Sequence, residues 1–463
     1  MIDKQEIDAK ADDLGVHAAN VQRDYVFGWL LAALARPDNP LQPMLILKGG
    51  NCFRKAYFEH ARFSNDLDFS TQTELEANAL LQGLSQACSF AREMSGVDFL
   101  INESRVSERR LADSESTIYD ARVYFKSFYG EEDVRIRVDL DVKEYDRLFL
   151  PIQTRRLIHS YSDASQCRAE VRCLKLEELL ASKLKALLQR RHCPDLYDFV
   201  HAVFFQKALD VSRREVLATF LKQTIYEPQP QIARNLLLEL PFQTIRGFWN
   251  EYLVCPKLSL FTFDNAESWF KAIIAEIFAL VEPRVVAYAG PGRGVPLTYF
   301  PSQPRSDIME SARLHRLLGF IYDGLDRVVE PYALVFKRRR DGVGREYLYG
   351  WDRLGGRSGE VGIKMYIADK VQSVTMLEET FEPRFPIELT KSSGYFGKPF
   401  STSGTRSIGS QRSRPARNVF GIEYTVECPY CSKRFKRSQY DTKLNDHKDR
   451  YGNRCYGKMG YMV

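Results

Sequence analysis

A stretch of 24 residues near the N-terminus constrains the fold more than any other part of the chain. Residues 47–70 read LKGGNCFRKAYFEHARFSNDLDFS, and a short apolar run leads into them. Gly49 and Gly50 can end that buried strand in a tight turn, and the segment NCFRKAYFEHA is then predicted to be helical. Asp66 and Asp68 follow on a second predicted strand. The stretch therefore predicts a strand, a glycine turn, a helix and a strand that carries two carboxylates.

The two aspartates point to a metal site. Residues two apart in a strand project from the same face, so Asp66 and Asp68 point together. Two such carboxylates repel each other unless a positive charge lies between them, and Mg²⁺ prefers oxygen ligands of this kind. Asp139 or Asp141, on the alternating strand 134–142, could add the third carboxylate that two-metal phosphoryl chemistry requires. The alternative is that Asp-Leu-Asp marks an ordinary strand end or surface turn.

The glycine turn and a lysine in an apolar stripe fit a phosphate ligand. Backbone N–H groups at a helix start can hold a phosphate when no side chain intervenes, as at Gly49 and Gly50. In the helix predicted over 174–191, Lys183 lies inside the apolar stripe, whereas Lys185 lies on the solvent face. A lysine avoids such a stripe unless it is paired, so a triphosphate or the aspartate cluster is its expected partner. A lysine that snorkels at the stripe's edge is the alternative.

Two further aspartates, Asp195 and Asp198, follow a proline turn after this helix, in the segment PDLYDF. They would hold Lys183, Arg190 or Arg191 in place, or they would cap a helix. The sequence leaves both interpretations open.

The length and composition predict a folded protein of several domains. A chain of 463 residues is too long for one ordinary core, so two to four domains are expected. The acidic N-terminus is no secretory signal, and the longest apolar run, residues 26–35, is too short for a membrane span, so we expect a cytoplasmic protein. Residues 391–463 contain 15 Lys or Arg and 5 Asp or Glu. This basic tail suggests a polyanionic partner, unless it is only solubilising.

Two linker-like stretches divide the chain. Residues 289–307 are rich in Gly and Pro, and residues 392–418 are rich in Ser, Gly and Arg. A small mixed sheet with helices is predicted first, and a mostly helical region follows it. The expected units are an α+β domain over 1–205, a helical region over 206–288, a β-rich domain over 307–390, a flexible basic linker over 391–420 and a zinc module over 421–463.

The C-terminal module carries a zinc-ligand pattern. Cys428 and Cys431 form a Cys-x₂-Cys knuckle, and His447 and Cys455 follow them. Four such ligands suit tetrahedral Zn²⁺, and a module this short rarely folds without a metal or a disulfide. Basic and aromatic residues interleave around the knuckle, which fits contact with nucleic acid. A finger that only docks on its own protein is the alternative.

The motifs of the first domain resemble the AbiEii/AbiGii nucleotidyltransferase toxin family, a branch of the DNA polymerase β-like nucleotidyltransferase superfamily. The resemblance covers roughly residues 20–205. It depends on LKGGNCFRKAYF, RFSNDLDFS, the strand 134–142, LEELLASKLKALLQRR and DLYDF. The order and spacing of these segments make it specific, and it implies a polymerase β-like nucleotidyltransferase fold.

The resemblance implies a role for each matching residue. Asp66, Asp68 and Asp139 would bind Mg²⁺, with Asp141 as the competitor for the third place. Lys183 would contact the nucleotide and Asp195 would complete the catalytic set. The other nucleotide-binding residues that it implies are Lys48, Gly49, Gly50 and Ser64. Asn51 departs from the family, in which a small hydroxyl residue is common, so the phosphate contact there stays open.

The resemblance also implies a reaction and its biological context. Members of the family are thought to transfer a nucleotide from an NTP to an acceptor, and some modify the 3′ end of tRNA and so stop growth. They commonly act beside an antitoxin and in defence against phage. The resemblance therefore predicts a Mg²⁺-dependent nucleotidyltransferase toxin with an RNA acceptor, tRNA being favoured.

The middle region, 307–390, resembles a WYL domain, a small β-rich, Sm-like module. The segments that carry the resemblance include VVEPYALVFKRRR and REYLYGWDRLGG. The usual Trp-Tyr-Leu triplet is here residues 346–348, Glu-Tyr-Leu, and Lys364 and Lys370 replace the usual arginines. The resemblance implies a regulatory domain that binds a nucleotide or nucleic acid, and a structural spacer is the alternative.

Two other functions remain open from the sequence. One is an AMPylation-type enzyme that transfers the nucleotide to a protein hydroxyl. The other is a non-enzymatic regulator that binds nucleic acid through the WYL-like and zinc modules. The combined set of Asp66, Asp68, Asp139 and Lys183 favours an enzyme over the regulator, because a binding module has no need of a lysine in an apolar stripe.

Overall fold

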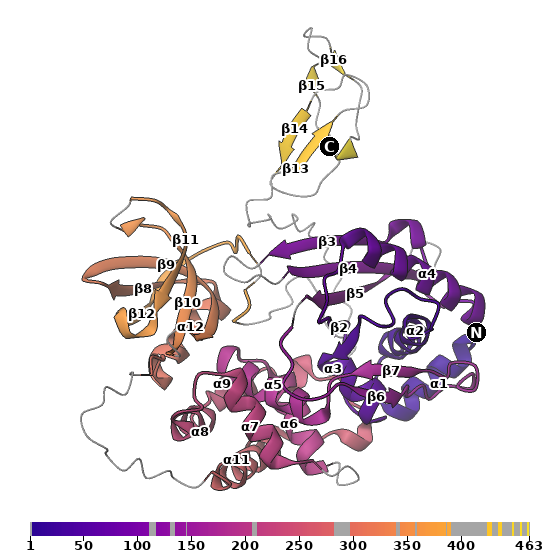
Figure 1. Ribbon diagram of the computed structural model, residues 1–463, viewed down its shortest axis with the longest axis horizontal. Coiled ribbons are helices and arrows are strands. Elements are labelled where there is room, and N and C mark those ends of the chain that lie inside the picture. Colours follow the sequence, from indigo (N-terminus) through magenta and orange to yellow (C-terminus); the bar gives the residue numbers. More distant parts are fainter. Residues whose placement is uncertain are drawn as a thin grey trace.

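The computed structural model describes most of the chain (Figure 1). The described residues are 2–110, 117–129, 135–144, 146–205, 211–281, 297–338, 343–356, 359–385 and 387–389, together with five short strands between 424 and 462. Helices and strands alternate in the first part and strands dominate the later parts, so the fold is a mixture of helix and sheet, as predicted.

A seven-stranded mixed sheet forms the centre of the first part. Its order is β3-β4-β5-β2-β1-β7-β6, with β2 parallel to β5, β1 parallel to β7 and the other neighbours antiparallel. The strands are β1 (Ile46–Lys48), β2 (Asp66–Ser70), β3 (Arg105–Arg110), β4 (Thr117–Lys126), β5 (Arg135–Lys143), β6 (Gln153–Arg156) and β7 (Glu170–Cys173).

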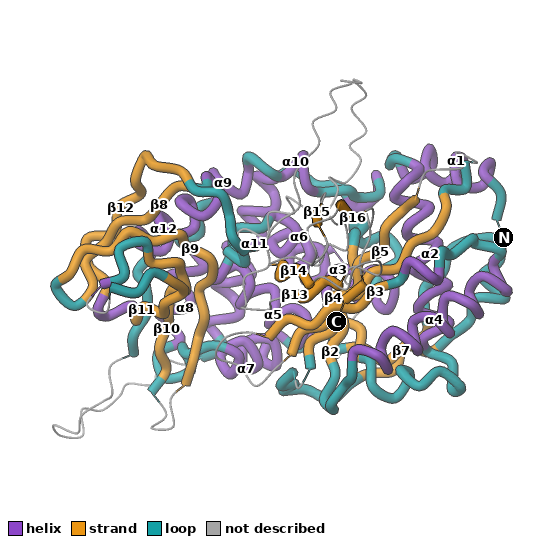
Figure 2. The backbone as a smooth tube through the Cα atoms, turned by 90° about the horizontal axis from the view of Figure 1, so that it is seen from above, coloured by secondary structure: helices purple, strands orange, loops and turns teal. Residues whose placement is uncertain are grey.

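The two faces of this sheet differ in polarity because side chains alternate along each strand. In β4, Ala121, Val123 and Phe125 are buried, whereas Arg122 is exposed and Tyr124 is half-buried. Figure 2 shows the sheet between two groups of helices, with α2 and α4 on one side and α5 and α6 on the other. The helices of the first group are α1 (Lys4–Leu14), α2 (Ala18–Leu34) and α4 (Ala77–Ser95), and a short turn η2 (Ile101–Glu103) follows them.

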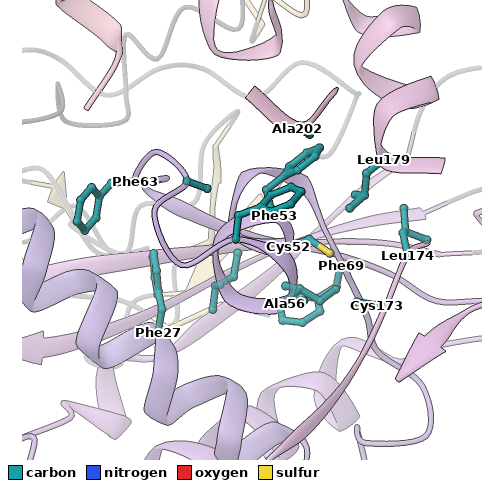
Figure 3. Close-up of a cluster of buried hydrophobic side chains, with 14 of the residues drawn as sticks. Phe27, Cys52, Phe53, Ala56, Phe63, Phe69, Cys173, Leu174, Leu179 and Ala202 are labelled. Atoms are coloured by element: carbon teal, nitrogen blue, oxygen red, sulfur yellow. The ribbon is translucent and has the colours of Figure 1, made fainter. Parts of the chain in front are cut away.

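The predicted helix after the glycine turn is present but is not regular. It begins as α3 (Gly49–Cys52) and continues as a π-helical turn, η1 (Phe53–Tyr57). Figure 3 shows Phe53 of this segment among buried apolar side chains. Those from other elements include Phe27, Phe69, Cys173, Leu174, Leu179 and Ala202. Packing from both helix groups thus holds the glycine turn against the sheet.

The helices that follow the sheet share its core. One continuous hydrophobic cluster runs from Ile2 to Phe278, so the expected helical region is packed against the sheet without a break. Its elements are α5 (Leu176–Gln189), α6 (Cys193–Val200), η3 (His201–Phe205), α7 (Arg213–Gln223), α8 (Pro230–Leu238), α9 (Phe242–Arg246), α10 (Trp249–Tyr252), η4 (Lys257–Ser259) and α11 (Phe263–Ala279).

A second core belongs to the β-rich part of the chain. Helix α12 (Ser302–Leu314) packs on a five-stranded antiparallel sheet of order β11-β10-β9-β8-β12. Its elements are β8 (Arg316–Tyr322), β9 (Leu325–Arg338), β10 (Gly344–Asp352), β11 (Gly362–Ile367), the turn η6 (Ala368–Lys370) and β12 (Val371–Thr380). The small β-rich domain is therefore present, and its likeness to a WYL domain stays a prediction.

The C-terminal module is described only in its strands. β13 (Tyr424–Glu427) pairs with β14 (Arg434–Arg437) and β17 (Tyr461–Met462), and β15 (His447–Lys448) pairs with β16 (Arg454–Cys455). In that second pair His447 lies directly opposite Cys455. Cys428 and Cys431 lie outside the described residues, so the zinc site stays a prediction. Within the described residues, no helix combines the length and the apolar character that crossing a membrane would require.

Candidate active site

Strand register brings the predicted carboxylates together on one face of the sheet. Asp66 lies opposite Asp139, and Asp68 lies opposite Asp141. On the other side of β5, Asp120 of β4 also lies opposite Asp141. Residues that lie opposite each other in a ladder point to the same face, so these five side chains share the face that looks toward α5 and α6. We call this surface the acidic face.

The glycine turn lies directly against the acidic face. Gly49 has a φ of +70°, in the left-handed region, and a Cβ atom there would lie 1.9 Å from Oδ2 of Asp68. A Cβ at Gly50 would lie 2.8 Å from both Oγ of Ser64 and Nη2 of Arg62. Gly49 is therefore required for its backbone conformation and for the space beside it, whereas Gly50 is required for space alone.

Asp66 is held in place by the turn and by the loop before its strand. Oγ of Ser64 donates a hydrogen bond of 2.8 Å to Oδ1 of Asp66. The buried amide of Asn51 donates to the backbone carbonyl of Asp66 at 2.5 Å. The residue that departs from the family pattern thus ties the first turn of α3 to the start of β2.

Asp139 is engaged by two arginines of the same face. Nε of Arg137 lies 2.8 Å from Oδ2 of Asp139, and Nε of Arg122 lies 3.5 Å from Oδ1. Burial raises the pKa of Asp139, and the two arginines oppose that shift. Asp141 stands opposite Asp68, so the structure offers both carboxylates as the third member of the set, and the choice between them stays open.

Lys183 and Asp195 belong to a buried ion-pair network between α5 and α6. Nζ of Lys183 lies 2.9 Å from Oδ1 of Asp195 and 2.7 Å from Oδ2 of Asp198. Arg190 adds a second cation to Asp195 at 2.7 Å, and Arg62 pairs with Asp198 at 2.7 Å. We call these five residues the α5–α6 network.

The network keeps its carboxylates ionised although they are buried. Burial alone would raise the pKa of Asp195, but Arg190 and Lys183 outweigh it and hold that pKa well below its usual range. The same balance, through Arg62 and Lys183, lowers the pKa of Asp198. Of the two interpretations of PDLYDF, the structure supports the one in which the aspartates hold Lys183 and Arg190.

A second group of charges lies beyond Asp68 on the acidic face. Nζ of Lys48 lies 3.1 Å from Oδ2 of Asp146, and Nζ of Lys143 lies 2.7 Å from its Oδ1. Oγ of Ser70 donates to the same carboxylate at 2.6 Å. The two lysines and Asp146 influence Lys185 of α5 electrostatically. Lys185 was expected on the solvent face but is half-buried, because α5 turns this side toward the sheet.

Several residues of the site were not singled out in the sequence. Arg137 lies two positions before Asp139, so strand alternation could have identified it. Arg62 precedes Ser64 in the quoted RFSND segment, but nothing local indicates that it reaches Asp198. Asp146 follows β5 in a loop. Its pairing with Lys143 is local, but its contacts with Lys48 of β1 and Ser70 of β2 form only in the fold.

The acidic face fits a divalent cation by its chemistry. It offers the carboxylate oxygens that Mg²⁺ prefers, from Asp66, Asp68 and either Asp139 or Asp141. As the side chains stand in the described part of the chain, no three Asp, Glu, His or Cys side chains converge on one point.

A comparison with known protein families matches the part of the chain that contains these residues. Residues 30–250 match the family described as "Nucleotidyl transferase AbiEii toxin, Type IV TA system". The matched range includes the acidic face, the glycine turn and the α5–α6 network. No curated protein matches the sequence.

Solved structures of two bacterial proteins are similar in part. One is MenT4, a nucleotidyltransferase toxin from Mycobacterium tuberculosis H37Rv, with 16% identity, a TM-score of 0.40, and coverage of 60% of this chain and 89% of that chain. The other is JHP933 from Helicobacter pylori, with 15% identity, a TM-score of 0.37, and coverage of 57% and 94%. Both scores lie below 0.5, so neither likeness carries an argument about function.

Proposed function

From the match of residues 30–250 to the AbiEii nucleotidyltransferase toxin family, we propose that this enzyme transfers a nucleotide from an NTP to RNA, with the 3′ end of tRNA as the favoured acceptor. The family assigns the general reaction and its toxin character. The acceptor, the metal and the residue roles are our proposal.

The observation that carries the proposal is the contact between the glycine turn and the acidic face. Gly49 has no side chain, and its α-carbon lies beside the carboxylate of Asp68. Backbone N–H groups at the start of α3 are therefore available to a phosphate close to a pair of carboxylates. This juxtaposition suits a nucleoside triphosphate whose phosphates lie on the turn.

Mg²⁺ would be held by Asp66 and Asp68, with Asp139 as the favoured third ligand and Asp141 as the alternative. Bound there, the metal would neutralise charge on the phosphates and polarise the α-phosphate for attack. The proposal thus assigns the acidic face to the metal and the turn to the phosphates.

The remaining residues position the reactants. Ser64 orients the carboxylate of Asp66 through its hydrogen bond. The α5–α6 network holds Lys183 and Asp195 rigidly beside the face, and Arg190 of this network lies near enough to Asp68 to interact with it electrostatically. As the acceptor hydroxyl attacks the α-phosphate in line, one aspartate of the face accepts its proton, the bond between the α- and β-phosphates breaks, and pyrophosphate leaves.

RNA is favoured over protein as the acceptor because of the charge around the site. The exposed side chains of Arg105 and Arg122 lie opposite each other on β3 and β4, next to Asp139 in the same row of the sheet. The C-terminal residues 391–463 add a strongly basic segment. Such groups suit a phosphodiester backbone.

The test is a transfer assay with the purified protein, each α-labelled NTP, Mg²⁺ and cell extract. Label that enters RNA would support the proposal and identify the nucleotide. Asp66→Asn/Asp68→Asn, checked for folding by circular dichroism, should abolish the label. Label confined to a protein band would favour the AMPylation-type alternative. Failure of every NTP to label any acceptor, with the protein folded, would count against the proposal.

The biological context is proposed on the family alone. The toxin family implies an antitoxin partner, and we propose a toxin–antitoxin pair that acts in phage defence by abortive infection. Growth arrest on expression of the wild-type chain, absent with Asp66→Asn/Asp68→Asn, is the expected result. The match to an enzyme family argues against the non-enzymatic regulator considered from the sequence.

A further inference from the structure

Three lysines from three different elements surround one carboxylate beside the glycine turn. Lys48 ends β1, Lys143 ends β5, and Lys185 lies on α5. Lys48 and Lys143 are both paired with Asp146. We call these four residues the lysine cluster, and at neutral pH with all groups ionised it carries a net charge of +2.

Lys185 is the member that lacks a partner. Among the residues that the structure describes, it makes no hydrogen bond and no ion pair, although it is half-buried. Burial comes first among the effects that lower the pKa of Lys185 to about 8, and Lys143 and Lys48 add to it while Asp146 opposes it. Holding a third ammonium group at this place costs stability, and an anionic ligand would offset that cost.

The position of α5 directs Lys185 toward the cluster. Glu178 and Lys185 are seven residues apart, so they lie on the same side of the helix. Glu178 accepts hydrogen bonds from the backbone N–H groups of Phe149 and Leu150, at 3.0 Å and 2.7 Å. This side of α5 therefore faces the segment that follows Asp146.

The cluster continues the phosphate path that begins at the turn. Lys48 is the residue immediately before Gly49, and it lies opposite Asp68 in the sheet. Lys143 lies opposite Ser70, on the same face and one step further from Asp66. A chain of phosphates that starts at the acidic face and crosses the turn would reach the lysine cluster next.

On this basis, and given the proposed function, we propose that Lys185, with Lys48 and Lys143, binds the β- and γ-phosphates of the NTP and then the pyrophosphate that leaves. The assignment goes to Lys185 and not to Lys183, because the α5–α6 network already satisfies the ammonium group of Lys183. Lys185 is thereby a substrate-binding residue that discriminates triphosphates from monophosphates.

The test measures binding to the full-length protein by titration calorimetry, with inorganic pyrophosphate, ATP and AMP as probes in the presence of Mg²⁺. Lys185→Gln should weaken pyrophosphate and ATP about tenfold, which is typical for the loss of one hydrogen bond to a charged group. It should leave AMP binding unchanged. Lys185→Arg, which keeps the charge, should bind all probes within about threefold of wild type. If transfer assays identify another NTP, that nucleotide and its monophosphate replace ATP and AMP.

The control is Lys222→Gln, which removes a charge from an exposed position on α7 and should change no affinity. Equal pyrophosphate affinity in wild type and Lys185→Gln, or no pyrophosphate binding to the folded wild type, would overturn the inference. Transfer activity with an unchanged KM for NTP in Lys185→Gln would overturn it while leaving the proposed function intact. If pyrophosphate binding depends on Lys185 but no nucleotide transfer is detected, the proposed reaction is wrong and the inferred anion site stands.

Discussion

At the scale of single residues, Gly49 combines two requirements that are usually separate. Its backbone is in the left-handed region, which costs another residue about 1–2 kcal/mol. Its missing Cβ also makes room for the carboxylate of Asp68. Gly324 has a similar φ of +77° but open space around it. A comparison of the two glycines therefore separates the effect of backbone conformation from the effect of space.

We predict that Gly324→Ala loses about 1–2 kcal/mol of stability, the cost of the left-handed backbone alone, and that Gly49→Ala loses at least as much and also loses activity. Gly49→Ala must displace Asp68 and should lower nucleotide transfer at least about a hundredfold, as misplacement of reacting groups does. Gly324→Ala should transfer at the wild-type rate. Urea unfolding and the transfer assay check the two effects, and near-normal activity of Gly49→Ala would contradict the placement of the turn.

The titration of Lys185 provides a second prediction at this scale. The charged groups that interact with it are Lys48 from β1, Lys143 from β5 and Asp146 from the loop after β5. A bound polyanion favours the protonated amine, so affinity is constant below the pKa of about 8 and falls above it. Between pH 7 and pH 9 the wild-type affinity for pyrophosphate should fall about tenfold. Lys185→Gln should show a nearly flat profile, and an equally steep one would assign the titration to another group.

At the scale of elements, the α5–α6 network joins two helices and the loop before β2. Each carboxylate in it accepts contacts from two cations, so removal of one aspartate leaves buried charges unpaired. The network thereby couples the position of Arg62, which lies beside Gly50, to the packing of the two helices.

We predict that Asp198→Ala lowers the free energy of unfolding by about 3–5 kcal/mol at pH 7, because Arg62 and Lys183 lose a buried partner. Asp264→Ala removes an aspartate from an exposed pair with Arg246 and should cost less than about 1 kcal/mol. Urea unfolding of both variants checks the difference. Equal small effects would show that water replaces the lost carboxylate.

The contribution of the α5–α6 network to stability depends on pH. The pKa values of Asp195 and Asp198 are lowered in the fold, so their stabilising contribution is complete above the ordinary pKa of about 3.9 and is lost as pH falls through the folded values. The wild type should therefore lose stability steeply below about pH 4, and Asp198→Asn should lose less over that range. Urea midpoints at pH 3 and pH 6 for both proteins provide the check.

At the scale of the whole molecule, the β-rich part lies against the end of helix α5, at the opposite end of the molecule from α1 and α2 (Figures 1 and 2). Buried Arg305 of α12 donates to the carbonyl of Leu188 at 2.6 Å and to Glu346 of β10 at 2.5 Å. Glu388, after the last strand of this part, interacts electrostatically with Arg190 of the α5–α6 network. The β-rich part is thus in contact with the helix that carries Lys183 and Lys185.

We predict that Arg305→Met destabilises the protein by about 3–5 kcal/mol, since Glu346 is buried and would lose its cation. Arg214→Ala, at an exposed position of α7, should have no effect beyond about 0.5 kcal/mol. Thermal unfolding followed by calorimetry checks both. A normal unfolding curve for Arg305→Met would show that the contact between the two cores is dispensable.

Much of the fold and part of the site could be predicted from local pattern. Strand alternation and helical periodicity identified the strand that became β5 (Arg135–Lys143) and the helix that became α5 (Leu176–Gln189). The spacing of Asp66 and Asp68 placed them on one face, and the apolar stripe of α5 made a partner for Lys183 necessary. These features depend only on neighbours a few residues apart, so local pattern is enough to predict them.

The partners across the fold were decided by tertiary structure alone. Which strand lies beside β2 determines that Asp66 faces Asp139, and the packing angle of α5 turns Lys185 toward Asp146 and not toward solvent. The partners of Lys183 are aspartates of α6, whereas the sequence also allowed a bound triphosphate as its partner. Such pairings depend on contacts between residues far apart in the chain, and periodicity within one element carries no information about which other element will pack against it.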